Sequence, residues 1–333
     1  MEEVNDKRNK TMQNTKKHMI SSLLAGAGVI FAVSPSNAAD MPSSRTTVKM
    51  TVTAASLAYG RNAPHINPED VVVERGKRRL HVTGFVPAQG THAGLDLFVL
   101  IDEASTPSLS IQLDDLRKFI RAQPATTAVG VGYMRNATVQ LAQDLTSDHA
   151  KAANALRPPL GYSGASGSPY LSAVNLMKQR PEHHNRREIV MITDGIDPAV
   201  RTLGMWELNP NPNVDSASNI AQRTGTIIHT IYASGARRSD RNYWKATSGQ
   251  MDMARLSDET GGKSFYLGLE DPVSYSPYLD KLQEILDNQY LLSFSAVPEK
   301  KSGLQRVKLS TPIVGVVLSS HDGVWVPALR QAE

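Results

Sequence analysis

Two nearly unbroken apolar runs dominate the pattern of hydrophobic and polar positions along the chain. Residues 95–101 and 189–192 are rich in Leu, Val, Ile and Met, and the runs lead to two carboxylates, Asp102 and Asp194. Continuous apolar runs of this length are typical of strands that are buried on both faces of a parallel sheet. Ligands of open α/β sheets bind beyond the carboxyl ends of the strands. If the two strands are neighbours, both carboxylates lie at one edge of the sheet, and this edge is the candidate site.

From residue 94 onward, strand patterns alternate with helical patterns. Strands are predicted at 127–134, 138–142, 226–232 and 263–267, and helices at 109–120, 148–156, from 168 to about 177, 214–223, 250–260 and 278–288. Alternation of this kind predicts the α/β class, with a doubly wound, mainly parallel sheet covered by helices on both faces.

The segments on either side of this region follow a period of two residues instead. Apolar and polar residues alternate over 48–52, a glycine turn separates the patterns at 71–73 and 80–82, and further strands are predicted at 290–296, 306–309 and 313–318. We expect the two flanks to pack together as a small β-sandwich-like module. The predicted organisation is a signal peptide (1–38), a linker (39–47), N-terminal strands of the β-module (48–90), the α/β domain (94–288) and C-terminal strands of the β-module (289–333).

The first 38 residues resemble a secretory signal. Lys16 and Lys17 precede an apolar stretch of small and aliphatic residues at 19–33, and Ser36-Asn37-Ala38 forms a small-x-small cleavage site. The chain has no cysteine, which excludes disulfides, thiolate metal sites and a lipoprotein anchor. We therefore expect a periplasmic or extracellular protein that is cleaved after Ala38 or Ala39. The alternative is an uncleaved membrane anchor.

The balance of charge argues against several classes of partner. The chain of 333 residues is 40% hydrophobic and 20% charged, an ordinary globular composition, and its formal net charge is +4. Residues 1–38 carry five basic and three acidic residues, so the remainder has 31 basic and 29 acidic ones. This balance predicts no nucleic-acid partner, and no later segment is apolar over enough residues to give a stable membrane span after cleavage.

Three motifs in a fixed order carry a family resemblance. A strand is followed by an Asp-x-Ser-x-Ser-like sequence, a hydroxyl residue opens a middle helix, and a later strand is followed by Thr-Asp-Gly. Residues 94–288 therefore resemble a von Willebrand factor type A (VWA) domain, and the chain is similar to exported bacterial "VWFA-related" proteins. In that family these motifs form a metal-ion-dependent adhesion site. The matching positions here are Asp102-Glu103-Ala104-Ser105-Thr106, Ser168 before Pro169, and Asp194 in Thr193-Asp194-Gly195.

The resemblance implies a binding protein without catalysis. A hard divalent cation, Mg²⁺ ahead of Mn²⁺ or Ca²⁺, needs about six oxygen ligands. Asp102, Thr106, Ser168 and Asp194 would supply part of this shell, and an acidic residue of a partner protein would complete it. Ala104 departs from the family pattern because it removes one hydroxyl ligand, which Ser105 replaces only if the loop shifts. Glu103, Asp197 and Trp206 are the residues expected to contact the partner.

Two other interpretations remain open at this point. A serine hydrolase would use Ser163 in Gly161-Tyr162-Ser163-Gly164-Ala165, with Asp194 and His229 in the order of α/β-hydrolases, although no strand precedes the serine. A structural module with an eroded metal site would use Ser168 only as a helix cap, with the two aspartates bonded to loop amides. His229 lies within a predicted buried strand, so we interpret it as a core histidine.

Overall fold

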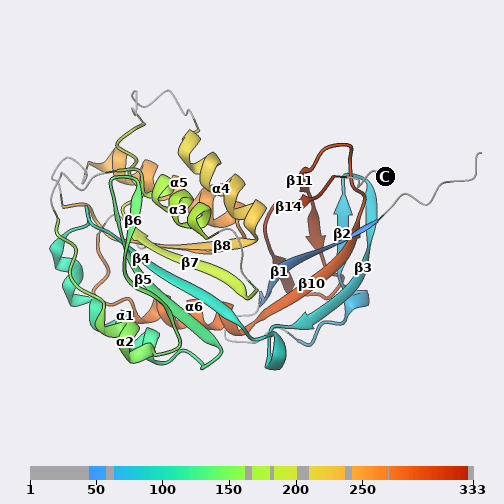
Figure 1. The fold of residues 1–333 in the computed structure, drawn as a ribbon, viewed down its shortest axis with the longest axis horizontal. Coiled ribbons are helices and arrows are strands. Elements are labelled where there is room, and N and C mark those ends of the chain that lie inside the picture. The colour runs from blue at the N-terminus through green and yellow to red at the C-terminus, as the bar shows by residue number, and fades with distance from the viewer. Residues whose placement is uncertain are drawn as a thin grey trace, which may run out of the picture. The chain divides into compact units, whose positions relative to one another are not determined.

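The computed structural model describes residues 45–57, 64–161, 167–180, 184–200, 210–236, 242–266, 268 and 270–328 (Figure 1). The predicted signal peptide and its cleavage site lie outside these ranges. Within the described ranges, no helix is long and apolar enough to cross a membrane. Residues 42–333 cluster into one compact unit, to which every described element belongs.

A six-stranded sheet in the order β6-β5-β4-β7-β8-β9 forms the centre of the α/β part. Its strands are β4 (Leu95–Asp102), β5 (Thr127–Arg135), β6 (Thr138–Thr146), β7 (Arg186–Thr193), β8 (Thr226–Tyr232) and β9 (Ser264–Phe265). All neighbouring pairs are parallel except β5 and β6, which form an antiparallel hairpin at one edge. The predicted class of a mainly parallel sheet is confirmed.

Helices cover both faces of this sheet (Figure 1). One face packs against α1 (Leu113–Arg121), α2 (His149–Asn154) and α6 (Ser276–Asp287), and the other against α3 (Pro169–Gln179), α4 (Pro212–Thr224) and α5 (Tyr243–Glu259). In β4, Leu97 and Val99 belong to the first core and Phe98 and Leu100 to the second. The apolar run is nearly unbroken because successive side chains point into opposite cores.

The strand order reverses at β4. The chain moves from β4 to β5 on one side, and β7, β8 and β9 follow on the other. In doubly wound sheets the two loops at such a reversal diverge, which opens a crevice outside the carboxyl ends of the strands. The topology therefore makes the carboxyl ends of β4 and β7 the candidate place for a ligand.

The flanking segments interleave in a second, antiparallel sheet with the order β12-β2-β3-β10-β1-β13. Its strands are β1 (Thr46–Ser56), β2 (Val72–Arg75), β3 (Arg78–Pro87), β10 (Gln289–Ala296), β12 (Lys308–Ser310) and β13 (Val316–Ser319), and β11 (Gly303–Arg306) pairs with β14 (Gly323–Val326) in a separate ribbon. The two flanks share one hydrophobic core, in which Val52 and Phe294 are fully buried. The predicted extra module of antiparallel strands from both flanks is confirmed, and it is called the β-module below.

Two local predictions are wrong. Helix α5 begins at Tyr243 rather than at residue 250, because the Asn242 side chain caps it by accepting a hydrogen bond from Trp244 N. Its first two turns lack an apolar stripe, so periodicity alone did not reveal them. The strand predicted at 306–309 corresponds instead to two short strands, β11 and β12, the one predicted at 313–318 is present as the shorter β13, and β14 is an additional strand. Short strands of this kind alternate too briefly for a pattern to fix their limits.

Candidate functional site

The two aspartates at the ends of the apolar runs lie at the same edge of the sheet. Strands β4 and β7 are parallel neighbours in the register Ile101↔Ile192, so Asp102 and Asp194 follow at the ends of adjacent strands. Asp102 Oδ2 accepts a hydrogen bond of 2.8 Å from Thr193 Oγ1, the residue that precedes Asp194. Both aspartates are 6% exposed. The reversal of the strand order is therefore where two neighbouring strands are each followed or ended by an aspartate.

Each of the two carboxylates also closes a tight turn. Asp102 Oδ1 accepts from Ala104 N at 2.9 Å, and Asp194 Oδ1 accepts from Ile196 N at 2.9 Å. A backbone amide two residues further on is the usual partner of an Asp side chain in a turn. These bonds hold each carboxylate in a defined position relative to the loop that follows it.

Ser168 occupies the first position before helix α3 and has two roles there. Its Oγ accepts from Leu171 N at 3.3 Å, which confirms the predicted cap, and donates to Asp197 Oδ2 at 2.6 Å. Asp197 also accepts from Asn213 Nδ2 at 2.8 Å and is buried. The prediction that Asp197 faces a partner is therefore corrected: its side chain points inward and joins the loop after β7 to α3 and α4.

The loop after β4 is held against the segment after β8. Thr106 N donates to Ser234 O at 2.9 Å, and Ser105 forms an isolated bridge with Gly235. Thr106 Oγ1 accepts from Ser108 Oγ at 3.1 Å. Ser105 is 1% exposed, and its hydroxyl has no hydrogen-bond partner among the described residues. A buried hydroxyl without a partner is costly, so this oxygen is a natural place for a ligand to bind.

Glu103 does not face solvent, which corrects the prediction that it contacts a partner. It is fully buried, forms an ion pair with Arg157, and accepts from Leu160 N at 2.8 Å. The Arg157 guanidinium also lies 3.8 Å from the centroid of the Tyr133 ring. The charge of Glu103 is therefore compensated, and the side chain anchors the loop at 157–161 beside the site.

The edge around Asp194 is acidic. Burial raises the pKa of the Tyr170 hydroxyl well above its ordinary value, and the nearby carboxylates of Asp252, Asp194 and Asp197 raise it further. Tyr170 donates to Gly195 O at 2.7 Å, so its ring lies directly beneath the Asp194 turn. Burial likewise raises the pKa of Asp252, although Asn211 and Arg255 oppose the shift. Negative charges gathered in this way favour the binding of a positive ion.

One carboxylate near the edge was missed by the sequence reasoning. Asp271, from the loop before α6, accepts from Ser234 Oγ at 2.6 Å and from Ser234 N at 2.5 Å. Nothing in the local sequence distinguishes Asp271 from other loop aspartates, because its partner is far away along the chain. The bond ties the segment after β8 to the loop before α6.

The donor chemistry of the edge fits a hard cation. Within the described ranges, no group of three or more His, Cys, Asp or Glu side chains is placed to hold a metal ion. A cation here would rely on the two aspartates and on hydroxyl oxygens, which are the ligand types that Mg²⁺ and Ca²⁺ prefer. Among the described residues, the hydroxyls of Thr106 and Ser168 each have one acceptor position that the bonds above do not use, and the buried Ser105 hydroxyl has no described partner.

His229 is a structural residue of the sheet core. It is fully buried in the middle of β8, its Nε2 lies 2.7 Å from Glu188 Oε2, and its Nδ1 accepts from Lys263 N. Since Nδ1 accepts, Nε2 carries the proton and donates it to Glu188. His229 is therefore bonded to Glu188 rather than to Asp194, as a core histidine would be. Ser163 and Trp206, which the sequence also proposed as functional residues, lie outside the described residues.

Comparison with known proteins gives likeness in structure only. The chain matches no family model and no curated protein. An aerotolerance-related membrane protein from Bacteroides fragilis has a TM-score of 0.39 and 14% identity, over 58% of this chain and 99% of that one. BatB from Bacteroides thetaiotaomicron has a TM-score of 0.40 and 15% identity, over 58% of this chain and 97% of that one. The SpRpn10 VWA domain has a TM-score of 0.38 and 12% identity, over 56% of this chain and 94% of that one. Likeness of this degree concerns the fold alone.

Proposed function

We propose that this chain, whose α/β part has a VWA-like fold, is an exported, non-catalytic binding protein that docks a partner protein at the carboxyl edge of its parallel sheet. The observation that carries the proposal is the position of Asp102 and Asp194 at the ends of adjacent strands, where the strand order reverses. The hydrogen bond between Thr193 and Asp102 keeps the two strand ends together. Ligands bind at this position in doubly wound folds of many kinds.

The same proposal includes a divalent cation at this edge, with Mg²⁺ ahead of Mn²⁺ and Ca²⁺. Asp102 and Asp194 would supply the charged ligands, and Ser105, Thr106 and Ser168 would supply hydroxyl oxygens. Support comes from the partnerless hydroxyl of Ser105 and from the acidic surroundings of Asp194. When bound, such an ion would offer an open coordination position to an acidic residue of the partner.

Calorimetric titration with Mg²⁺, Mn²⁺ and Ca²⁺ tests the cation. We expect the wild type to bind at least one of them, and Asp102→Asn to bind it about tenfold or more weakly, because a charged ligand is lost. Asn keeps an acceptor for the Ala104 amide, so the turn is preserved. Asp114→Asn, an exposed carboxylate on α1, is the matched control and should bind like the wild type. No heat with any of the three ions rejects the cation and leaves a structural module with an eroded site.

A capture experiment tests the partner separately. The purified chain is incubated with envelope extract, with and without EDTA, beside the Asp194→Asn variant. Recovery of one protein that is lost both with EDTA and in Asp194→Asn is the expected result. Capture that is unaffected by the substitution would place the docking surface elsewhere on the molecule.

Export rests on the first 38 residues and has its own test. We expect the mature protein, recovered from the periplasm or the medium, to begin at Ala39 or Asp40, as N-terminal sequencing would show. An intact N-terminus in the membrane fraction would indicate a retained anchor instead.

A further inference from the structure

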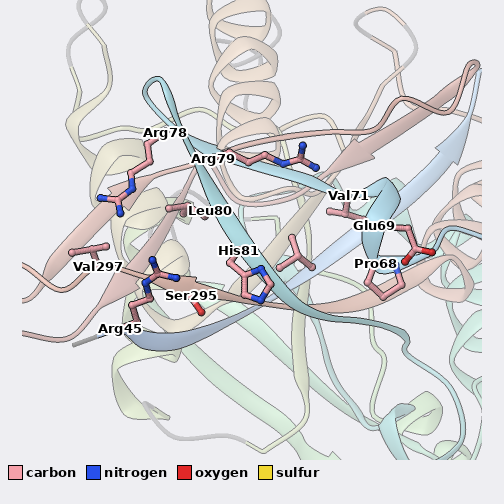
Figure 2. A pocket seen from close by; sticks show the side chains of 11 residues that line it. Arg45, Pro68, Glu69, Val71, Arg78, Arg79, Leu80, His81, Ser295 and Val297 are labelled. Atoms are coloured by element: carbon pink, nitrogen blue, oxygen red, sulfur yellow. The ribbon is translucent and has the colours of Figure 1, made fainter. Parts of the chain in front are cut away.

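A pocket of about 490 Å³ opens in the β-module, at the end of strand β10 (Figure 2). Strand β10 lies between β3 and β1, with Ser295 opposite His81 on one side and Thr47 on the other. Because β10 ends at Ala296, no described strand fills the slot between Arg45, just before β1, and the first residues of β3. The pocket occupies this slot, and Val297 forms part of its wall.

From this pocket we infer a second binding site, which takes a phosphorylated small molecule. Its wall carries Arg45, Arg78, Arg79 and His81, and among the described residues that line it Glu69 is the only carboxylate. None of the three arginines forms an ion pair within the described part of the chain, unlike Arg75, which is paired with Glu299. The wall therefore carries an excess of positive charge that no described carboxylate neutralises.

The charged side chains reach the pocket from two parts of the β-module. Arg45 lies just before β1, whereas Arg78, Arg79 and His81 belong to β3, on the other side of β10. In Figure 2, Arg79 extends toward Glu69, and Arg78 points away from it. Arg78 and Arg79 diverge because successive residues of a strand point to opposite faces. Three arginines against one carboxylate leave two positive charges on the described wall.

The chemistry of this wall matches a phosphate monoester. The two positive charges that Glu69 leaves uncompensated balance the two negative charges of the group, and the planar guanidinium donors suit its oxygens. A carboxylate would leave one of the charges unbalanced. A pocket of this volume holds more than a phosphate, and Pro68, Val71, Leu80 and Val82 provide apolar walls for the rest of the ligand.

The distribution of charge along the sequence supports the assignment. Residues 45–93 and 289–333, which contain the described strands of the β-module, carry 12 basic and six acidic residues, whereas residues 94–288 carry 19 basic and 22 acidic ones. The two sites therefore differ in electrostatic character: the carboxyl edge of the parallel sheet is acidic, and the β-module is basic. An anionic ligand is attracted to the β-module before any specific contact forms.

Calorimetric titration with glucose 6-phosphate at low salt tests the inference, with glucose and glucuronate as controls for the phosphate. We expect the wild type to bind glucose 6-phosphate and neither control, and Arg45→Gln and Arg78→Gln each to weaken binding about tenfold. Lys77→Gln is the matched control, because Lys77 is exposed in the turn beside Arg78 but does not line the pocket. It should weaken binding by less than about twofold at moderate salt.

Three results would overturn the inference. The first is glucose 6-phosphate binding no better than glucose or glucuronate, and the second is equal weakening by Lys77→Gln and Arg78→Gln, which would indicate diffuse attraction. The third comes from vesicles of phosphatidylglycerol and phosphatidylcholine in equal parts. If the chain binds these vesicles but not glucose 6-phosphate, the basic wall serves a lipid surface. All of the substituted residues are exposed, so the variants should fold like the wild type.

Discussion

The acidic residues near the carboxyl edge differ in how well their charge is compensated. Asp197 accepts hydrogen bonds from Ser168 and from Asn213, while Asp252 has one described hydrogen-bond donor, Asn211. Removing a carboxylate from water disfavours its ionised form unless donors or cations replace the lost hydration. A residue of this kind therefore makes the stability of the fold depend on pH.

We predict that Asp252→Asn removes one such dependence. Burial raises the pKa of Asp252 above its ordinary value near 3.8, with further increases from Asp197 and Asp215. The folded protein therefore holds this proton at a pH at which the unfolded chain has already lost it. The stabilisation is complete below the pKa of the unfolded chain, and it is lost as the pH rises through the raised pKa of the folded protein. The neutral amide resembles the protonated carboxyl group, so the variant should be more stable than the wild type at pH 7 and equal to it in acid.

Urea unfolding across a series of pH values measures this difference. Asp258→Asn on the same helix is the control, because Asp258 is exposed and should leave the pH dependence unchanged. A difference between Asp252→Asn and the wild type that is constant from acid to neutral pH would show that Asp252 does not titrate abnormally.

At the scale of elements, helix α5 approaches the candidate site through a glycine. A Cβ at Gly249 would lie 2.3 Å from Asp194 O, and one at Gly195 would lie 2.4 Å from Gly249 O. Gly195 also has φ 71°, which disfavours other residues. The helix therefore packs directly on the turn that presents Asp194, and its position helps to fix that turn.

Gly249→Ala should destabilise the protein by about 1–3 kcal/mol, since the added methyl group cannot fit without moving α5 or the turn. The sign of the change in the free energy of unfolding is informative, because replacing Gly by Ala in an unhindered helix would stabilise the protein by about 1 kcal/mol. Gly303→Ala is the matched control, since a Cβ there meets no atom within 4 Å. Denaturant unfolding of both variants makes the comparison, and a Gly249→Ala variant as stable as the wild type would disprove the close approach.

At the scale of the whole molecule, the β-module and the α/β part are joined at several points. Only Asn288 separates α6 from β10. His321 Nε2 lies 3.0 Å from Thr226 O at the start of β8, and Asp322 N donates to Glu259 O at the end of α5. The two described flanks of the chain are thus held in one sheet and also against the α/β part. Such links favour unfolding as one unit.

Phe294→Ala tests this cooperativity. Phe294 is fully buried in the core of the β-module, and its truncation should cost about 3–5 kcal/mol. We expect calorimetry to show a single transition that shifts to lower temperature. Hydrogen exchange of β4, in the other sheet, should accelerate as well. Two transitions, of which only one shifts, would show that the module and the α/β part unfold independently.

Much of the fold follows from local pattern. The nearly unbroken apolar run of β4 indicated a strand buried on both faces, and the structure places its side chains alternately in two cores. Ser168 before Pro169 indicated a helix cap, which is present. The first turns of α5 were missed because their side chains, including Trp244 at 57% exposure, face solvent and leave no apolar period.

The hydrogen-bond and ion-pair partners of the polar side chains could not be predicted from local pattern. Ser168 was expected beside Asp194 but is bonded to Asp197, which is 29 residues away along the chain. Glu103 was expected at the surface but is paired with Arg157, 54 residues away. Hydrophobic periodicity says which face of an element is buried, not which polar groups from other elements meet there.

The sequence by itself determined the class of the fold and the position of the candidate site along the chain. The reason is that strand and helix periods are local, and that Asp102 ends one apolar strand and Asp194 directly follows the other. Only the tertiary structure decided that β4 and β7 are neighbours, that Glu103 and Asp197 turn inward, and that β10 stops short of Arg45. These facts depend on strand order and on contacts between residues that are distant along the chain. Buried polar groups are nearly always hydrogen-bonded, and their partners are set by which elements pack together.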